Sequence, residues 1–299
     1  MKISVIIPFY IRTELLRVSV GSVLSQTYPV HEIILVNDCS PEKCDWISKE
    51  FPQVKILKTE KNSGSGAARV LGVNHATGTH VASLDCDDFW YSDKLEKQVC
   101  FYKNVNDPSG IYSHRQHVRE SKDIISIRPT ILPIINEPIC EYLYVRNGLV
   151  QTNTLFMQKS VYLESAFHHD VPVTDDWEMV IVGESLGHQI YMQEDSLSQW
   201  NCLQSDSRES STFSTDYYYT QIERMKGLIT AKAAKAMLAR NLAPRHMANN
   251  NYTLGINLLL EAFLSRSLSL RQIGQIFMLH YFPFFYRRLA LIKSYVYQQ

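Results

Sequence analysis

The sequence has no excess of charge of either sign, because 30 Lys and Arg residues are balanced by 30 Asp and Glu residues. It also has no segment in which aromatic residues are interleaved with a basic patch, the pattern typical of RNA- and DNA-binding proteins. A chain without net charge has no general attraction to polyanions. We therefore expect no nucleic-acid partner, and any contact with phosphate groups must be local.

Paired cysteines and long apolar runs are missing as well. The six cysteines form no C-x-x-C pair, and the chain does not start with a charged segment followed by an apolar stretch and a cleavage site. This favours free thiols in a reducing cytosol. Because no apolar run reaches the about 20 residues of a membrane-spanning helix, we expect a cytoplasmic protein, either soluble or peripherally attached to a membrane.

What the first hundred residues do contain is an alternation of short apolar segments with segments of helical spacing. We expect strands at 3–7, 31–36, 54–57 and 80–84, and helices at 13–25, 42–50 and 65–75. This order predicts an α/β fold, with a mostly parallel, doubly wound sheet and helices on both faces. Ligands of such sheets bind beyond the carboxyl ends of the strands. The polar segments at 8–10, 37–40 and 85–88 all follow expected strands and should converge there.

Beyond about residue 105 the pattern becomes irregular. We expect short strands at 110–113 and 154–157, a helix at 177–186, and a loop at 205–215 that is rich in Ser, Thr and Asp. The remainder is expected to be helical, at 217–241 and 252–265, with a tail from about residue 268. This predicts an α/β domain at 1–215, with halves at 1–104 and 105–215, and a helical C-terminal region at 216–299.

Three carboxylates, Asp85, Asp87 and Asp88, follow the fourth expected strand within four residues. Such charges repel one another unless a positive group lies among them, and their hard oxygens suit Mg²⁺ or Mn²⁺. A divalent cation held there could carry a diphosphate. The alternative is that the aspartates end the strand and cap the next helix.

The first 104 residues also carry an ordered set of motifs. They are VIIPFY (5–10), SVLSQTYP (22–29), EIILVNDCS (32–40), NSG (62–64), ATG (76–78), LDCDD (84–88) and KLEKQ (94–98). Each is weak by itself, whereas the ordered set is specific, and together they resemble the inverting family 2 glycosyltransferases with a GT-A fold. The resemblance implies transfer of a sugar from a nucleoside diphosphate sugar to an acceptor hydroxyl. It also makes 1–104 the nucleotide-binding half and 105–215 the acceptor half.

The resemblance implies Pro8, Tyr10 and Asp38 as nucleotide-binding residues, because the family uses the loop after the first strand and the aspartate after the second. Tyr10 could pack on the base, and Asp38 could accept a hydrogen bond from a base N–H. The alternatives are a strand-ending turn and an Asx turn before Pro41. Arg69 could reach a phosphate oxygen, or it could lie on a solvated helix face.

Within the carboxylate cluster, we expect the three side chains to hold Mg²⁺ or Mn²⁺ and the adjacent ribose or sugar of the donor, with Asp87 or Asp88 as the direct metal ligand and Asp85 partly structural. A metal that bridges diphosphate oxygens stabilises the charge of the leaving group without a proton.

An inverting displacement also needs a base opposite the leaving group. The family supplies it from an acidic pair before an aromatic residue, and TDDWE (174–178) matches. Asp176 is the candidate base. Because the family more often has Glu-Asp, the choice between Asp176 and Asp175 stays open, as does the alternative that Thr174 or Asp176 merely caps a helix. His168 and His169 could touch the acceptor.

The C-terminal tail is basic and rich in apolar residues. Residues 262–299 include five basic residues and no acidic one, and IFMLHYFPFFY (276–286) is too short to span a bilayer but suited to its interface. Either the tail contacts the cytoplasmic face of a membrane, or it packs on the catalytic domain. The membrane interpretation implies a polyprenyl-diphosphate-linked glycan as acceptor, in the synthesis of O-antigen, capsule or exopolysaccharide.

Three other classes fit less well. The interpretation of GSG (64–66) as the start of a dinucleotide-binding G-x-G-x-x-G motif fails for two reasons. Arg69 stands where that motif has its third glycine, and the segment follows the third expected strand instead of the first. A nucleotidyltransferase that makes nucleotide sugars would carry a glycine-rich loop after the first strand, whereas 8–13 has no glycine. A non-catalytic nucleotide-sugar-binding protein of the same fold would not need both acidic motifs. The motifs do not specify the donor sugar, the base, the acceptor or the linkage.

Overall fold

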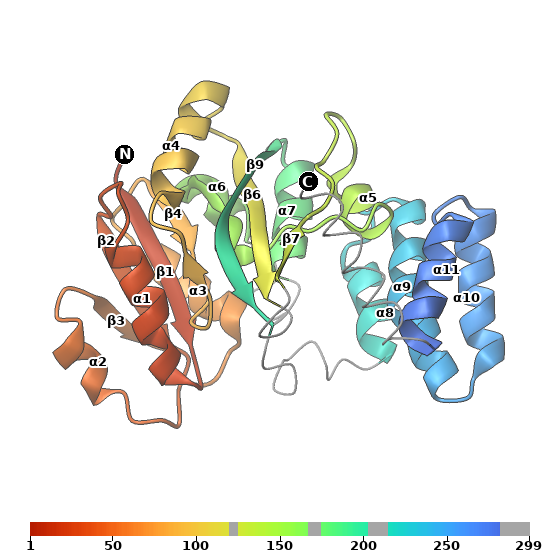
Figure 1. The fold of residues 1–299 in the computed structure, drawn as a ribbon, viewed down its shortest axis with the longest axis horizontal. Helices are drawn as coiled ribbons and strands as arrows, with labels where there is room; N and C mark the ends of the chain where they lie inside the picture. The colour runs from red at the N-terminus through yellow and green to blue at the C-terminus, as the bar shows by residue number, and fades with distance from the viewer. Residues whose placement is uncertain (120–124, 167–174, 203–214, 282–299) are drawn as a thin grey trace. The chain divides into compact units, whose positions relative to one another are not determined.

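The computed structural model describes residues 1–119, 125–166, 175–202 and 215–281. The chain forms two compact units (Figure 1). The first unit comprises residues 1–133 and 149–211, and the second comprises 134–148 and 212–299. His168, His169, Thr174, most of the expected loop at 205–215 and the tail after residue 281 lie outside the described residues.

A nine-stranded mixed sheet forms the centre of the first unit. Its parallel half has the order β3-β2-β1-β4, with β1 at Ile3–Phe9, β2 at Glu32–Asn37, β3 at Lys55–Lys58 and β4 at His80–Ser83. The register pairs Phe9 with Asn37 and Ile6 with Ser83, so the carboxyl ends of β1, β2 and β4 lie at one edge. The parallel sheet expected from the alternation is confirmed.

The other half of the sheet is mixed and continues in the order β8-β6-β9-β5, with β7 paired to β6. The strands are β5 at Phe89–Trp90, β6 at Ile111–Arg119, β7 at Ile125–Arg128, β8 at Phe156–Gln158 and β9 at Ile190–Asn201. The strands expected at 110–113 and 154–157 overlap β6 and β8. The sequence did not predict β9, because its many polar residues follow no clean alternation and its conformation depends on pairing with β6.

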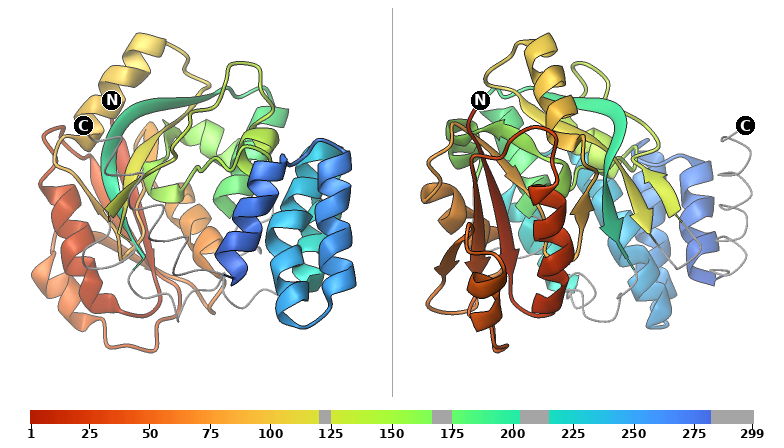
Figure 2. Two further views of the ribbon diagram at one scale, coloured as in Figure 1. Left: turned by 45° about the vertical axis from the view of Figure 1, so that its right-hand side comes forward. Right: turned by 60° about the vertical axis from the view of Figure 1, so that its left-hand side comes forward.

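Helices cover both faces of this sheet (Figure 2). They are α1 at Leu16–Leu24 after a short 3₁₀ turn, α2 at Asp45–Glu50, α3 at Ser65–Asn74, α4 at Lys94–Val105, α6 at Lys159–Ser165 and α7 at Asp175–Ser185. The odd-numbered residues of β1 share one buried core with apolar residues of α1, α2 and α4. The opposite face holds Ile6, which lies against α3. Because β1 is buried on both faces, its residues are apolar except for Ser4, whose Oγ donates a hydrogen bond to Glu32 at 2.6 Å.

Gly72 sets how closely α3 approaches the sheet. A Cβ at this position would lie 2.6 Å from Ile6 Cγ2 and 3.0 Å from Val36 Cγ2. A larger side chain would push α3 away from the sheet. Because Arg69 lies one turn earlier on the same helix, Gly72 also fixes the distance of Arg69 from the strand ends.

The second unit is helical. It contains α5 at Ile139–Tyr144, α8 at Thr215–Arg224, α9 at Ala231–Ala248, α10 at Tyr252–Leu264 and α11 at Leu270–Tyr281. Helices α9, α10 and α11 lie side by side in Figures 1 and 2. In the described part of the chain, none of the helices combines the length and the apolar character that crossing a bilayer requires.

The prediction of a single helix at 217–241 is wrong, because the structure has two helices there. Gly227 lies between them with a φ of +86°, a conformation that glycine adopts without strain and that ends a helix. Thr230 then starts α9, and its Oγ1 accepts a hydrogen bond from the N–H of Ala233 at 3.1 Å.

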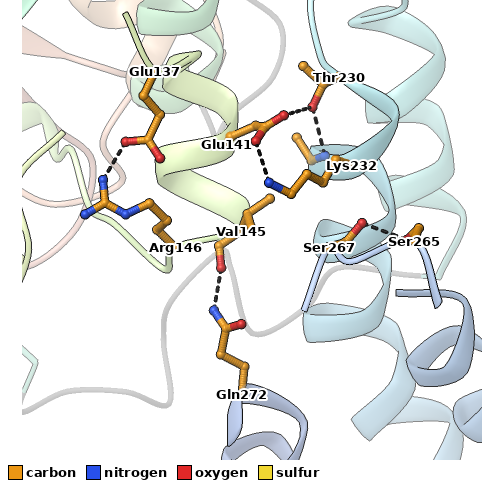
Figure 3. A network of polar contacts seen from close by, with 10 residues as sticks. Glu137, Glu141, Val145, Arg146, Thr230, Lys232, Ser265, Ser267 and Gln272 are labelled. Carbon is orange, nitrogen blue, oxygen red and sulfur yellow. Dashed lines mark hydrogen bonds and ion pairs between the residues drawn. The ribbon is translucent and has the colours of Figure 1, made fainter. Parts of the chain in front are cut away.

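Residues 134–148, expected in the α/β domain, belong instead to the helical unit (Figure 3). Glu141 accepts hydrogen bonds from Thr230 Oγ1 at 3.0 Å and from Lys232 Nζ at 2.9 Å. Gln272 Nε2 donates to the carbonyl oxygen of Val145 at 2.6 Å. These partners lie about ninety or more residues away along the chain, so no local pattern could show the assignment.

Candidate functional site

The loop after β1 is held by a carboxylate from the loop after β2. Glu42 accepts hydrogen bonds from the N–H of Thr13 at 2.9 Å, from Thr13 Oγ1 at 2.7 Å and from the N–H of Arg12 at 2.8 Å. The bonds from Thr13 and then from Arg12 hold the pKa of Glu42 below its ordinary value. Arg12 has a φ of 61°, so this anchoring keeps its backbone in a conformation that is uncommon for a side-chain-bearing residue.

Asp38, at the end of β2, holds the loop that leads into α3. Its buried carboxylate accepts hydrogen bonds from Thr59 Oγ1 at 2.8 Å, from the N–H of Ser63 at 3.0 Å and from the N–H of Gly64 at 2.8 Å. Tyr10 follows β1 and is 38% exposed, whereas Pro8 is buried within β1. Tyr10 is thus accessible to a ligand, and Asp38 positions the neighbouring loop.

Two ion pairs tie the carboxylate segment to the surrounding elements. Arg69 Nη2 lies 2.5 Å from Asp85 Oδ1, and Arg12 Nη1 lies 3.2 Å from Asp87 Oδ2. Arg69 is only 3% exposed, which excludes the solvated helix face as its environment. Arg12 joins the segment after β1 to the segment after β4, so the convergence of loops at this edge is confirmed.

Asp88 is in a different environment from its two neighbours. Its buried carboxylate accepts hydrogen bonds from Asn153 Nδ2 at 2.9 Å, from the N–H of Asn201 at 2.8 Å and from the side chain of Gln151. Burial, together with the charges of Asp87 and Asp85, raises the pKa of Asp88 well above its ordinary value. Asp88 therefore connects the end of β4 to β9 and to residues 151–153.

The three carboxylates thus make separate contacts. Among the described residues, no group of three or more His, Cys, Asp or Glu side chains is placed to hold a metal ion. Mg²⁺ at phosphate sites is usually bound by one or two carboxylates together with the phosphates of the substrate. The partly exposed carboxylate of Asp87 fits that requirement, and the metal roles of Asp87 and Asp88 remain a prediction.

The candidate base lies at the start of α7. The Oδ1 of Asp176 accepts a hydrogen bond from the N–H of Trp177 at 2.8 Å. Trp177 Nε1 in turn donates to the carbonyl oxygen of Val150 at 2.8 Å, next to the segment whose Gln151 and Asn153 bind Asp88. Residues 150–153 thereby connect the two acidic motifs, which are far apart in the sequence.

Four residues of this site escaped the sequence analysis. They are Arg12, Gln151, Asn153 and Asn201. Asn201 also donates from Nδ2 to the carbonyl oxygen of Asp87 at 2.6 Å, and Trp90 Nε1 donates to the carbonyl oxygen of Asn153 at 2.9 Å. Only Arg12 had a local signal, a basic residue in a loop that follows a strand; the others come from segments outside the motifs.

The sequence profile of Glycosyl transferase family 2 matches residues 4–166, more than half of the 299 residues. The chain belongs to this family. It is therefore a glycosyltransferase, as the motifs of the first 104 residues implied. The matched range includes both ion pairs and Asn153.

The chain is similar in sequence to two bacterial glycosyltransferases whose names describe their roles. The chain is 25% identical over 253 residues to the amylovoran biosynthesis glycosyltransferase AmsB of Erwinia amylovora, covering 81% of this chain and 84% of AmsB. It is 34% identical over 99 residues to the UDP-Glc:alpha-D-GlcNAc-diphosphoundecaprenol beta-1,3-glucosyltransferase WfgD of Escherichia coli, covering 32% of this chain and 39% of WfgD.

The fold of this chain is similar to that of a solved glycosyltransferase structure. The crystal structure of S. aureus TarS 1–349 in complex with UDP superimposes with a TM-score of 0.60 at 17% identity, covering 89% of this chain and 82% of that chain. This similarity confirms the GT-A fold expected from the sequence.

Proposed function

We propose that this glycosyltransferase moves a sugar, with inversion, from a nucleoside diphosphate sugar to a hydroxyl group of a polyprenyl-diphosphate-linked glycan during surface polysaccharide synthesis. The names of AmsB and WfgD, which refer to polysaccharide synthesis and to a diphosphoundecaprenol-linked substrate, support this substrate class. The observation that carries the proposal is the pair of arginine–aspartate contacts, Arg12–Asp87 and Arg69–Asp85, at the carboxyl ends of the parallel strands.

These contacts provide what a diphosphate donor needs. Tyr10 is exposed at the same edge and can pack on the base, and Asp38 orders the loop before α3. The guanidinium groups of Arg12 and Arg69 compensate two of the three carboxylates. In the proposed complex, both guanidinium groups would stabilise the charge that develops on the leaving diphosphate.

Asp87 is the residue that we expect to hold Mg²⁺ or Mn²⁺, since its carboxylate is partly exposed. Asp88 is buried and fully engaged with amide donors, so its first contribution is to hold Asp87 in place through Asn201. When bound, the divalent ion would neutralise the charge of the departing diphosphate.

Asp176 is the proposed base. Its carboxylate accepts the proton of the acceptor hydroxyl while that oxygen forms a bond to the anomeric carbon and the bond to the diphosphate oxygen breaks. The electron pair of the broken bond stays with the diphosphate, and the configuration at the anomeric carbon inverts. The hydrogen bond from the N–H of Trp177 keeps the other side of this carboxylate fixed.

A donor screen tests the proposal. Purified protein is mixed with Mn²⁺ or Mg²⁺ and a panel of nucleoside diphosphate sugars, and both thermal protection and release of nucleoside diphosphate are measured. We expect one donor class to protect the protein only with metal, and Asp87→Asn to remove this protection. The matched control is Asp195→Asn, which removes an exposed carboxylate that pairs with Lys97.

Three outcomes would contradict the proposal. Equal protection without metal would remove Asp87 as an ion ligand. Protection without nucleotide release in the presence of polyprenyl-diphosphate-linked acceptors would indicate a binding protein. Formation of a nucleotide sugar from a nucleoside triphosphate and a sugar phosphate would indicate a nucleotidyltransferase.

A further inference from the structure

Helix α10 of the second unit exposes a continuous apolar face. Tyr252, Ile256, Leu260, Phe263 and Leu264 recur at helical spacing and are 38–77% exposed. We call these five residues the α10 face. A run of large apolar side chains along three turns of one helix is more than the scattered exposure that is normal for a protein surface.

The α10 face does not take part in the core of the second unit. The side of the helix that packs inward consists of Gly255, Leu259 and Ala262, which are buried. A Cβ at Gly255 would lie 2.6 Å from Met247 Cγ and 2.9 Å from the carbonyl oxygen of Ala243, so this side lies closely against α9. The α10 face borders that buried side along the helix, and its five side chains remain exposed.

The charge of the second unit indicates what the face binds. Residues 134–148 and 212–299 contain 12 Lys and Arg against 5 Asp and Glu, a formal net charge of +7, although the whole chain is neutral. From residue 226 to 299 there are 10 basic residues and a single acidic one, Glu261. Arg266 follows α10 and Arg271 is the second residue of α11, and both are exposed.

We propose that the α10 face, together with Arg266 and Arg271, binds the surface of an anionic phospholipid bilayer. A helix with one apolar face and nearby cations lies in the bilayer interface, where apolar burial and attraction to anionic lipids add up. A second copy of the chain fits less well, because pairing these faces would bring two units of +7 charge together. The proposal concerns residues 252–271 and is independent of the tail segment at 276–286 and of the proposed transfer reaction.

Vesicle co-sedimentation of the full chain tests the proposal. Vesicles of phosphatidylcholine alone are compared with vesicles that contain about 30% phosphatidylglycerol, since anionic lipid supplies the surface charge. We expect the protein to bind the anionic vesicles, and the variant Leu260→Asn with Leu264→Asn to bind at least about tenfold more weakly. The matched control is Leu254→Asn, because Leu254 is 47% exposed on the same helix but lies outside the α10 face.

The charge contribution is tested by Arg266→Gln with Arg271→Gln, with Lys226→Gln as the control for an exposed cation that pairs with Glu223. We expect the double arginine variant to lose affinity for anionic vesicles about thirtyfold, because each of the two cations near the surface contributes about 1 kcal/mol. About 1 M salt should weaken binding of the unmodified protein, because it shortens the Debye length to about 3 Å.

Several results would overturn the proposal. Equal binding by the Leu254→Asn variant and the Leu260→Asn, Leu264→Asn variant would show that the α10 face is not the contact. Absence of binding to both kinds of vesicle would do the same. A dimer in size-exclusion chromatography that dissociates in the double leucine variant would assign the face to self-association instead. Thermal unfolding of every variant is measured in parallel, so that loss of binding is separated from loss of the fold.

Discussion

The two units of this glycosyltransferase distribute polar and apolar side chains in opposite ways. The first unit carries a formal charge of −7, with 18 Lys and Arg against 25 Asp and Glu, and it buries charged groups such as Arg69, Asp88 and Lys94. The second unit carries +7 and exposes large apolar residues on α10. Buried charge is unfavourable unless it is paired or has a function, and an exposed apolar face is unfavourable unless it binds something. This difference indicates that the candidate active site lies in the first unit, whereas the proposed membrane-binding surface lies in the second.

The largest effect should come from the proposed base of the first unit. Asp176→Asn keeps an oxygen that can accept the hydrogen bond from Trp177 but removes the proton acceptor, so kcat should fall by about 10²–10⁴. Donor-induced thermal protection should remain. Steady-state kinetics with a water-soluble acceptor measure the change.

Asp175→Asn is the matched control for this prediction, on the adjacent residue of the same acidic pair. Loss of activity in Asp175→Asn with retention in Asp176→Asn would move the base to Asp175. Retention in both variants would remove the acidic pair from the mechanism. The α10 substitutions should leave kcat with a soluble acceptor unchanged, and a change there would break the separation of roles between the units.

A smaller effect, on stability, is expected at Asp88. Asp88→Ala leaves the donors of Asn153, Gln151 and Asn201 without their buried acceptor, while it relieves repulsion with Asp87 and Asp85. We expect a net loss of about 3 kcal/mol in the unfolding free energy of the first unit. All four tryptophans lie in this unit, so urea unfolding followed by tryptophan fluorescence reports on it.

Asp87→Ala serves as the comparison for Asp88→Ala, because Asp87 is partly exposed and its ion pair with Arg12 is open to solvent. Its effect on stability should stay below about 1 kcal/mol. If both substitutions destabilise the unit equally, Asp88 has no special positioning role.

The next effect is the pH dependence of the first unit. Burial, and then the charge of the N-terminal amine, lowers the pKa of His80 to about 4. Above the unfolded pKa of about 6.5, His80 is neutral in both the folded and the unfolded state. Between about pH 6.5 and about pH 4, His80 is protonated in the unfolded chain but stays neutral in the folded chain. The free energy of unfolding therefore falls as the pH falls through this range. We expect His80 to account for about 2 kcal/mol of lost stability between about pH 7 and about pH 5.

The variant His80→Phe checks this, since a phenyl ring retains the stacking on Phe156 and cannot titrate. Its unfolding free energy should depend less on pH by that amount. His31→Gln, a change at an exposed histidine, is the control for the loss of a histidine as such. An unchanged pH dependence in His80→Phe would assign the acid sensitivity to other groups, such as His114, whose pKa burial also lowers.

The smallest effect is expected in the second unit. Glu141→Gln removes the charge opposite Lys232 while an amide oxygen still accepts from Thr230. Both partners of the ion pair are partly exposed, so the loss should be below about 1 kcal/mol and should vanish at high salt. Helix melting followed by circular dichroism measures it, with Lys226→Gln as a control at a fully solvated pair. A loss of several kcal/mol would show that the second unit, too, depends on a polar contact.

Much of the first unit was predictable from the sequence. The first hundred residues alternate short apolar runs with segments of helical spacing, and the structure confirms the strands and helices expected from them. Strand β9 and the break at Gly227 were not predictable in this way. The former depends on a partner strand, and the latter on a single glycine with a positive φ, which the spacing of apolar residues does not reveal.

The candidate site shows the same division. Asp38 and the three carboxylates were found because motifs place them next to strand ends, and Arg69 was found as a basic residue on the first turns of an expected helix. Their individual roles were not, since Asp88 is distinguished from Asp87 only by contacts with Asn153 and Asn201, 65 and 113 residues further along the chain. Arg12 was missed because its importance arises from the ion pair with Asp87.

The amino-acid order alone determined the alternating elements, the position of acidic groups at the ends of parallel strands and the family, because these depend on neighbours within a few residues. Only the tertiary structure decided which carboxylate is buried, which arginine compensates which aspartate, that residues 134–148 join the helical unit, and that one face of α10 is left exposed. These features depend on which distant segments pack together, and packing is a property of the folded chain as a whole.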